Sequence, residues 1–142
     1  MADSANIVVR TVQNGFRNIV IRAALTSDGS GLTNYKVYDA TSATWAVNVQ
    51  GQTFKPGIYT KLVGLDYDVQ DLKIQLLWDA TTPEQIFPLG SAPEDFDWRS
   101  APLAVPSGLA GATGSILLST LNAVPNGTFF VILRLWKCVP QT

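Results

Sequence analysis

The sequence lacks histidine altogether and contains one cysteine among its 142 residues. Without histidine the chain cannot build a Ser-His-Asp triad, a Cys-His pair or most catalytic metal sites. The single cysteine, Cys138, cannot form an intrachain disulfide, and there is no histidine to activate its thiol. We therefore interpret Cys138 as an ordinary small apolar residue.

Charged side chains are also scarce, at 15% of the chain against about 25% in an average soluble domain. The ten basic residues are scattered and the formal net charge is -1, whereas nucleic-acid binding requires a basic patch. We therefore expect no nucleic-acid partner. A surface with so little charge indicates instead that other proteins cover part of it.

Long apolar runs and targeting signals are missing too. No run approaches the ~18 residues of a membrane span, and the first residues lack the basic and apolar segments of a signal peptide. We expect no membrane partner, and synthesis in a reducing cytosol. The length is that of a single domain over residues 1–142, in which residues 1–6 could form a flexible arm.

Carboxylates are the remaining candidates for chemistry, and their pattern is weak. Asp66 and Asp68 lie on the polar parity of their strand, and Asp79 follows Trp78 at a strand end. A glycosidase needs two inward-facing carboxylates about 5–10 Å apart, and no complete calcium-loop pattern is present. We predict no catalytic residue, no metal ligand, no cofactor, no small-molecule substrate and no enzymatic activity. A β-sandwich glycosidase or lyase that uses Asp79 is the alternative.

What the sequence does have is period-2 alternation of apolar and polar residues. The apolar members of four runs are Ile19, Ile21, Ala23 and Leu25; Trp45, Val47 and Val49; Val63, Leu65, Tyr67 and Val69; and Leu72, Ile74, Leu76 and Trp78. Turn sequences such as Asn14-Gly15 separate the runs. The pattern predicts an all-β, single-domain β-sandwich, jelly-roll-like, with roughly eight strands and with the indole of Trp78 in its core.

The last run, residues 129–136, is apolar on both parities apart from Arg134. A strand of this composition is buried on both faces. We therefore predict either a central strand or a strand whose outer face lies against a partner.

Residues 80–114 depart from the alternation and contain five of the eight prolines. Because proline cannot donate a hydrogen bond to a strand ladder, we predict one long Pro/Gly-rich loop here. Long loops are usually functional, and Phe87, Phe96 and Trp98 would anchor this one on a partner protein. Packing of the same aromatic residues on their own sheet is the alternative.

Four segments follow one another in the C-terminal half: LLWDATTP (76–83), FPLGSAPEDFDW (87–98), GLAGATGSILLST (108–120) and GTFFVILRLWK (127–137). This succession resembles small virion structural proteins of tailed bacteriophages, which decorate or cement the head shell. The resemblance implies a protein made in the host bacterial cytoplasm and located on the capsid surface, where it bridges neighbouring major capsid subunits. It also implies a homo-oligomer, a dimer or a trimer.

Two other functions are compatible with this amino-acid composition. One is a tail, neck or fibre component of the same kind of particle. The other is a carbohydrate-binding module, which would bind through exposed aromatic residues such as Trp98.

Overall fold

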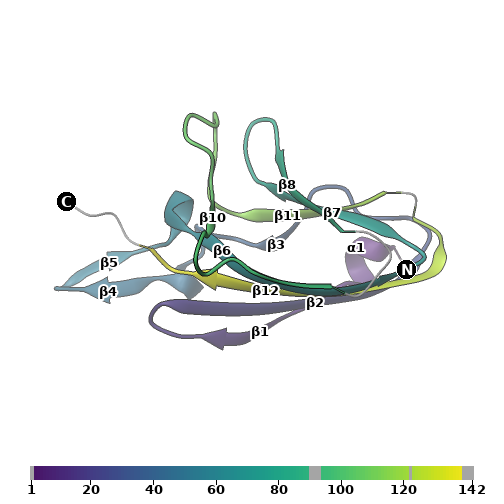
Figure 1. Cartoon of the computed structure of the whole chain (residues 1–142), viewed down its shortest axis with the longest axis horizontal. Coiled ribbons are helices and arrows are strands. Elements are labelled where there is room, and N and C mark those ends of the chain that lie inside the picture. Colours follow the sequence, from purple (N-terminus) through teal and green to yellow (C-terminus); the bar gives the residue numbers. More distant parts are fainter. Residues whose placement is uncertain (1, 90–93, 122, 139–142) are drawn as a thin grey trace.

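The computed structural model describes residues 2–89, 94–121 and 123–138. Two antiparallel sheets lie face to face in it, and Figure 1 shows the two layers edge-on. The strands of the first sheet are β1 (Val8–Asn14), β2 (Asn18–Asp28), β6 (Lys61–Gln70), β9 (Glu94–Asp97), β10 (Leu103–Ala104) and β12 (Pro125–Trp136). The second sheet contains β3 (Tyr35–Tyr38), β7 (Lys73–Trp78), β8 (Glu84–Leu89) and β11 (Ile116–Leu121).

The remaining elements are short. They are α1 (Asp3–Asn6), the 3-10 turns η1 (Ala43–Trp45) and η2 (Gly57–Tyr59), and the separate hairpin of β4 (Val47–Val49) and β5 (Gln52–Phe54). The hairpin projects from one end of the sandwich (Figure 1). No helix within the described residues is long and apolar enough to cross a bilayer.

The connectivity is that of a jelly roll, which confirms the predicted fold. Strands β2, β3, β6 and β7 pair in turn with β12, β11, β9 and β8, so that the first of eight strands pairs with the last. The sheet orders are β2-β12-β6-β9 and β3-β11-β7-β8. This arrangement is one long antiparallel hairpin rolled into two sheets. Strand β1 extends the first sheet beyond the eight, and β10 adds to its other side.

The core follows the alternation read from the sequence. The inward residues of β2, β6, β7 and β12 are almost fully buried and include Ile21, Leu65, Leu76 and Leu133. The side chain of Trp78 is 3% exposed, so its predicted place in the core is confirmed. The run at residues 45–49 differs from a long strand, because Trp45 belongs to η1 and only Val47–Val49 pair, with β5.

Strand β12 lies between β2 and β6, which confirms that it is a central strand. Its inward residues are buried. Its outward residues Phe130, Ile132 and Trp136 are only half-buried. The second apolar face of this strand therefore lies on the outside of the sandwich.

Residues 80–114 are not one continuous loop, because β8, β9 and β10 lie within them. Strand β8 contains Pro88 and forms the edge of the second sheet, where a missing N–H is tolerated. The part after β10 is held on its own domain by two backbone hydrogen bonds, from the amide of Thr81 to Ala110 and from the amide of Thr113 to Asp79. Gly114 closes this segment against η2, since a Cβ there would stand 1.8 Å from the Gly57 carbonyl oxygen.

The N-terminal residues do not form a free arm from Asp3 onward. They form α1, whose Asp3 is fully buried against the end of β2. Its carboxylate accepts hydrogen bonds from the Ser27 hydroxyl at 2.6 Å and from the amides of Asp28 and Gly31 at 2.8 Å. The sequence interpretation missed this anchor because the partners lie 24 to 28 residues away. Met1 lies outside the described residues.

Candidate interaction surfaces

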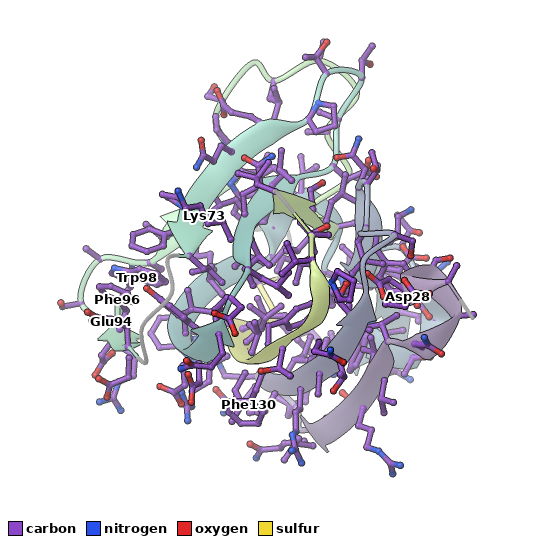
Figure 2. All side chains as sticks on the ribbon, turned by 90° about the vertical axis from the view of Figure 1, so that its right-hand side faces the viewer. Asp28, Lys73, Glu94, Phe96, Trp98 and Phe130 are labelled. Carbon is purple, nitrogen blue, oxygen red and sulfur yellow. The ribbon has the colours of Figure 1, made fainter. Side chains whose placement is uncertain are left out.

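The three aromatic residues predicted to bind a partner form one cluster. The ring of Phe87 on β8 lies 4.9 Å from Phe96 on β9 and 5.6 Å from Trp98, and the rings of Phe96 and Trp98 stack at 5.4 Å. Tyr67 on β6 extends the stack at 6.3 Å. Because β8 and β9 belong to different sheets, the cluster joins the two layers at one flank of the sandwich (Figure 2).

All three predicted residues are half-buried and pack against the core. The three aromatic side chains therefore pack on their own domain, as the alternative interpretation of the sequence predicted. Binding of a partner through their remaining exposed surface stays a prediction.

A polar pocket of about 370 Å³ lies beside this cluster. Its lining consists of Val63, Gly64, Asp66, Asp95, Phe96, Asp97, Arg99 and Arg134. Arg99 forms an ion pair of 2.7 Å with Asp97 and lowers the pKa of that carboxyl group to about 2. Arg134 forms an ion pair of 2.5 Å with Asp66. The Arg134 side chain lies directly over Gly64, and a Cβ added to Gly64 would stand 3.2 Å from the Arg134 side chain.

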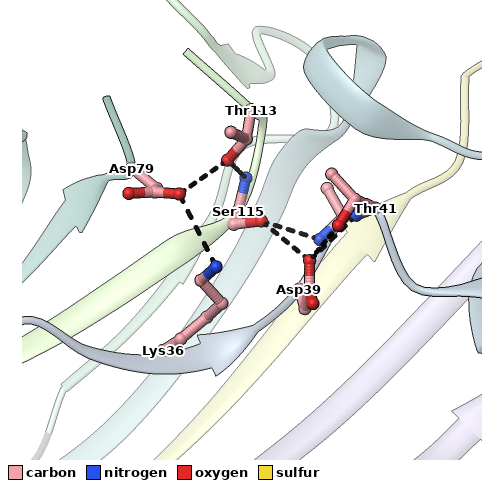
Figure 3. Close-up of polar contacts among 7 residues, drawn as sticks. Lys36, Asp39, Thr41, Asp79, Thr113 and Ser115 are labelled. Carbon is pink, nitrogen blue, oxygen red and sulfur yellow. Dashed lines mark hydrogen bonds and ion pairs between the residues drawn. The ribbon is translucent and has the colours of Figure 1, made fainter. Parts of the chain in front are cut away.

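Asp79 is the residue that the glycosidase alternative would use, and its carboxylate is engaged by neighbouring side chains of the same chain (Figure 3). Its Oδ2 accepts a hydrogen bond from the Thr113 hydroxyl at 2.9 Å and lies 3.8 Å from the Lys36 ammonium. Next to it, the Ser115 hydroxyl binds the amide of Ala40. These contacts hold the ends of β3, β7 and β11 together, which is a structural role for the carboxylate.

Other carboxylates also make structural contacts or point away from the core. Hydrogen bonds from Thr41 lower the pKa of Asp39, against the opposing effect of its burial. Asp66 and Asp68 lie on the outward parity of β6, as predicted. In the described part of the chain, no three His, Cys, Asp or Glu residues are placed to hold a metal ion.

Strand β1 is the surface that the sequence interpretation missed. All seven of its residues are exposed, and in the described residues it pairs on one side only, with β2. Val12 is 62% exposed, and Phe16 at the tip of the hairpin is 68% exposed. A long exposed edge strand with apolar side chains can pair with another chain, and the features of β1 that oppose pairing are Arg10 and a bulge at Val12. The available signal was that IVVRTV has valines on both parities of a strand that begins the domain.

The tip of this hairpin is held in place. The amide of Gly15 donates to the Asn18 carbonyl at 2.8 Å, and the Lys137 ammonium donates to the Asn14 side chain. Burial lowers the pKa of Lys137. The exposed side chains of β1 therefore project from a fixed support. Cys138, next to Lys137, is a half-buried free cysteine.

Comparisons with known proteins add little to this picture. No family model matches the sequence, and no curated protein matches it. Two solved structures are similar over 92% of this chain, namely a family 29 carbohydrate-binding module and a mutant of such a module. They cover 88% and 85% of their own chains, with a TM-score of 0.35 and 7% identity in both cases. A likeness this low carries no functional argument.

Proposed function

We propose that this chain is a structural virion protein of a tailed bacteriophage, which decorates or cements the capsid by bridging neighbouring major capsid subunits. The observation that carries the proposal is the exposed edge of β1, together with Val12 and Phe16. The resemblance of four C-terminal segments to such proteins and the low surface charge support it further.

The mechanism that we propose is mechanical. An extended segment of a capsid subunit adds to the free edge of β1, which spans about 23 Å over seven residues and is interrupted by a bulge at Val12. Phe16 and Val12 bury apolar surface against the same subunit. The chain contacts a second capsid subunit through another face. The two subunits can then separate only if one of these contacts is also broken.

The test uses the phage that encodes the chain, with the gene deleted and then supplied as wild type or as a variant. Val12→Lys places a charge in the apolar contact, so we expect the variant to be absent from purified particles. Their bursting temperature should then equal that of particles lacking the protein. Val124→Lys is the matched control, since Val124 is also an exposed valine and lies near the opposite end of β2.

Two results contradict the proposal. One is a normal resistance to heat and osmotic shock in particles that lack the protein. The other is equal incorporation of the Val12→Lys and Val124→Lys variants.

A carbohydrate-binding module is the second candidate, because the aromatic cluster adjoins a pocket with carboxylate and guanidinium groups. A sugar ring could stack on the exposed edge of the cluster and bind these groups. On a glycan array this function predicts binding that is lost in Trp98→Ala, with no effect on particle stability. Absence of binding by the wild-type protein removes this candidate.

A further inference from the structure

The outer face of the first sheet is divided by charge. One row of cross-strand neighbours runs from Arg10 to Arg22, then to Ile132, Asp66 and Asp95. Cross-strand partners in a sheet share a face, and the outward parity of β12 places this row outside the sandwich. Two positive residues therefore lie on one side of an apolar centre, and two negative residues lie on the other.

This row is symmetric about β12. The five residues come from β1, β2, β12, β6 and β9, so that two strands lie on each side of Ile132. Neighbouring strands are about 4.8 Å apart, so Arg10 and Asp95 stand about 10 Å from the centre in opposite directions.

Within the described residues no carboxylate pairs with the positive side, and the negative side is neutralised only in part. Arg10 lies opposite Arg22, an unfavourable pairing of like charges, and the Arg22 guanidinium lies over the Phe130 ring at 4.8 Å. On the other side Asp66 lies opposite Asp95. Arg134 pairs with Asp66, but Asp95 forms no ion pair within the described residues.

Each side of this row also has a shallow depression, and the two depressions differ in size. On the positive side is a hollow of about 130 Å³, lined by Val8, Arg10, Arg22 and Ala24. On the negative side is a hollow of about 310 Å³, lined by Asp66, Tyr67, Asp68, Glu94, Asp95 and Phe130. Between them, Phe130 and Ile132 form an apolar ridge on β12, and Figure 2 shows Phe130 at this face, away from the aromatic cluster.

We propose that a second copy of this chain packs on this face, through a two-fold axis that runs roughly along β12. The rotation exchanges the two sides, so Arg10 faces the partner subunit's Asp95 and Arg22 faces the partner subunit's Asp66. A two-fold axis across the strands would instead place Arg10 and Arg22 each against the same residue of the second copy. The axis along β12 brings Arg134 near its own counterpart, but Arg134 is paired with Asp66 in its own chain. Self-complementarity is the requirement of an isologous interface, and an unrelated partner would not need it.

The size of the face sets the strength of this dimer. Five strands with three aligned rows of outward residues cover roughly 500 Å² per copy, below the roughly 800 Å² of a standard complex. The ridge of Phe130 and Ile132 supplies the apolar centre, and the charged pairs fix the orientation. Dimer formation should therefore depend on protein concentration in solution. The inference of a dimer is independent of the proposed function.

Sedimentation equilibrium of charge-reversed variants tests the pairing. We expect the wild-type protein to dimerise between about 10 and 500 µM. Arg10→Glu and Asp95→Arg should each weaken the dimer by at least about 10-fold, because each places like charges across the interface. The double variant Arg10→Glu/Asp95→Arg restores opposite charges in both symmetry-related pairs, so its dimer should return.

The design separates loss of the interface from loss of the fold. Each single reversal places opposite charges side by side within its own sheet, at Arg22 or Asp66, so the monomer should unfold no more easily than the wild type. Lys73→Glu, an exposed reversal on the second sheet, is the control that keeps the wild-type dimer. A monomeric wild-type protein, single variants that dimerise normally, or a double variant that stays monomeric would each overturn the proposal.

Discussion

The two faces of β12 have almost the same composition and opposite environments. The inward residues Val131 and Leu133 are each 1% exposed, because the second sheet covers them. The outward Phe130 and Ile132 are equally apolar, yet within a single chain they have only partial cover from neighbours on their own sheet. Apolar residues on the inner side of this central strand are explained by the core, and for those on the outer side we propose a contact with another molecule.

Ionisable groups in the interior and on the outer face also have pKa shifts with different physical causes. Among the interior groups, burial raises the pKa of Tyr38 to about 12. On the outer face, the ion pair with Arg99 lowers the pKa of Asp97 to about 2. Removal from water dominates between the sheets, whereas pairing with an opposite charge dominates outside.

The largest difference between the faces should appear in paired truncations on β12. Leu133→Ala leaves a cavity between the sheets, and we expect it to lower the free energy of unfolding by about 2–5 kcal/mol. Ile132→Ala removes a similar volume from the outer face, and we expect a loss below about 1 kcal/mol for the monomer. Urea unfolding of both variants at high dilution measures the difference.

Equal losses in these two variants would contradict the contrast. They would mean that the outer face of the strand is already packed within the single chain.

A smaller effect should follow from the titration of Tyr38. An unfolded tyrosine loses its proton near pH 10, whereas burial raises the pKa of Tyr38 to about 12, against the opposing effect of its hydrogen bond with Thr60. The unfolded chain therefore binds fewer protons in this interval, and stability falls as the pH rises from 10 to 12. The contribution is up to about 2.7 kcal/mol, and urea unfolding between pH 8 and pH 12 measures it.

Tyr38→Phe is the control for this titration. It leaves the Thr60 hydroxyl without its buried partner, so the protein is less stable at pH 8, but the alkaline loss should shrink. An alkaline loss of the same size in both proteins would assign it to other groups.

Much of the core could be predicted from the sequence, because alternation encodes the face on which each side chain lies. The buried parities of β2 and β7, that of β6 from Leu65 onward and the core position of Trp78 were predicted in this way. The central place of β12 was one of two alternatives, drawn from a run that is apolar on both parities. The strands within residues 80–114 could not be, since Pro88 argues against a strand unless the strand is known to be an edge.

Long-range placement explains the other differences. The anchor of Asp3 depends on partners at Ser27, Asp28 and Gly31, which no local pattern connects to it. The charged row from Arg10 to Asp95 depends on the register of four strand pairs, and a slip of one residue would move its members to the opposite face. Surfaces of this kind become visible only once the sheet is assembled.

The claim that this chain reinforces a capsid is tested most directly by a cryo-EM map of the purified particles of the phage that encodes it. The proposed function predicts density for the jelly roll over the joins between shell subunits, with the free edge of β1 against the shell. Density for this fold in the tail alone, or particles that contain no copy of the protein, would contradict it.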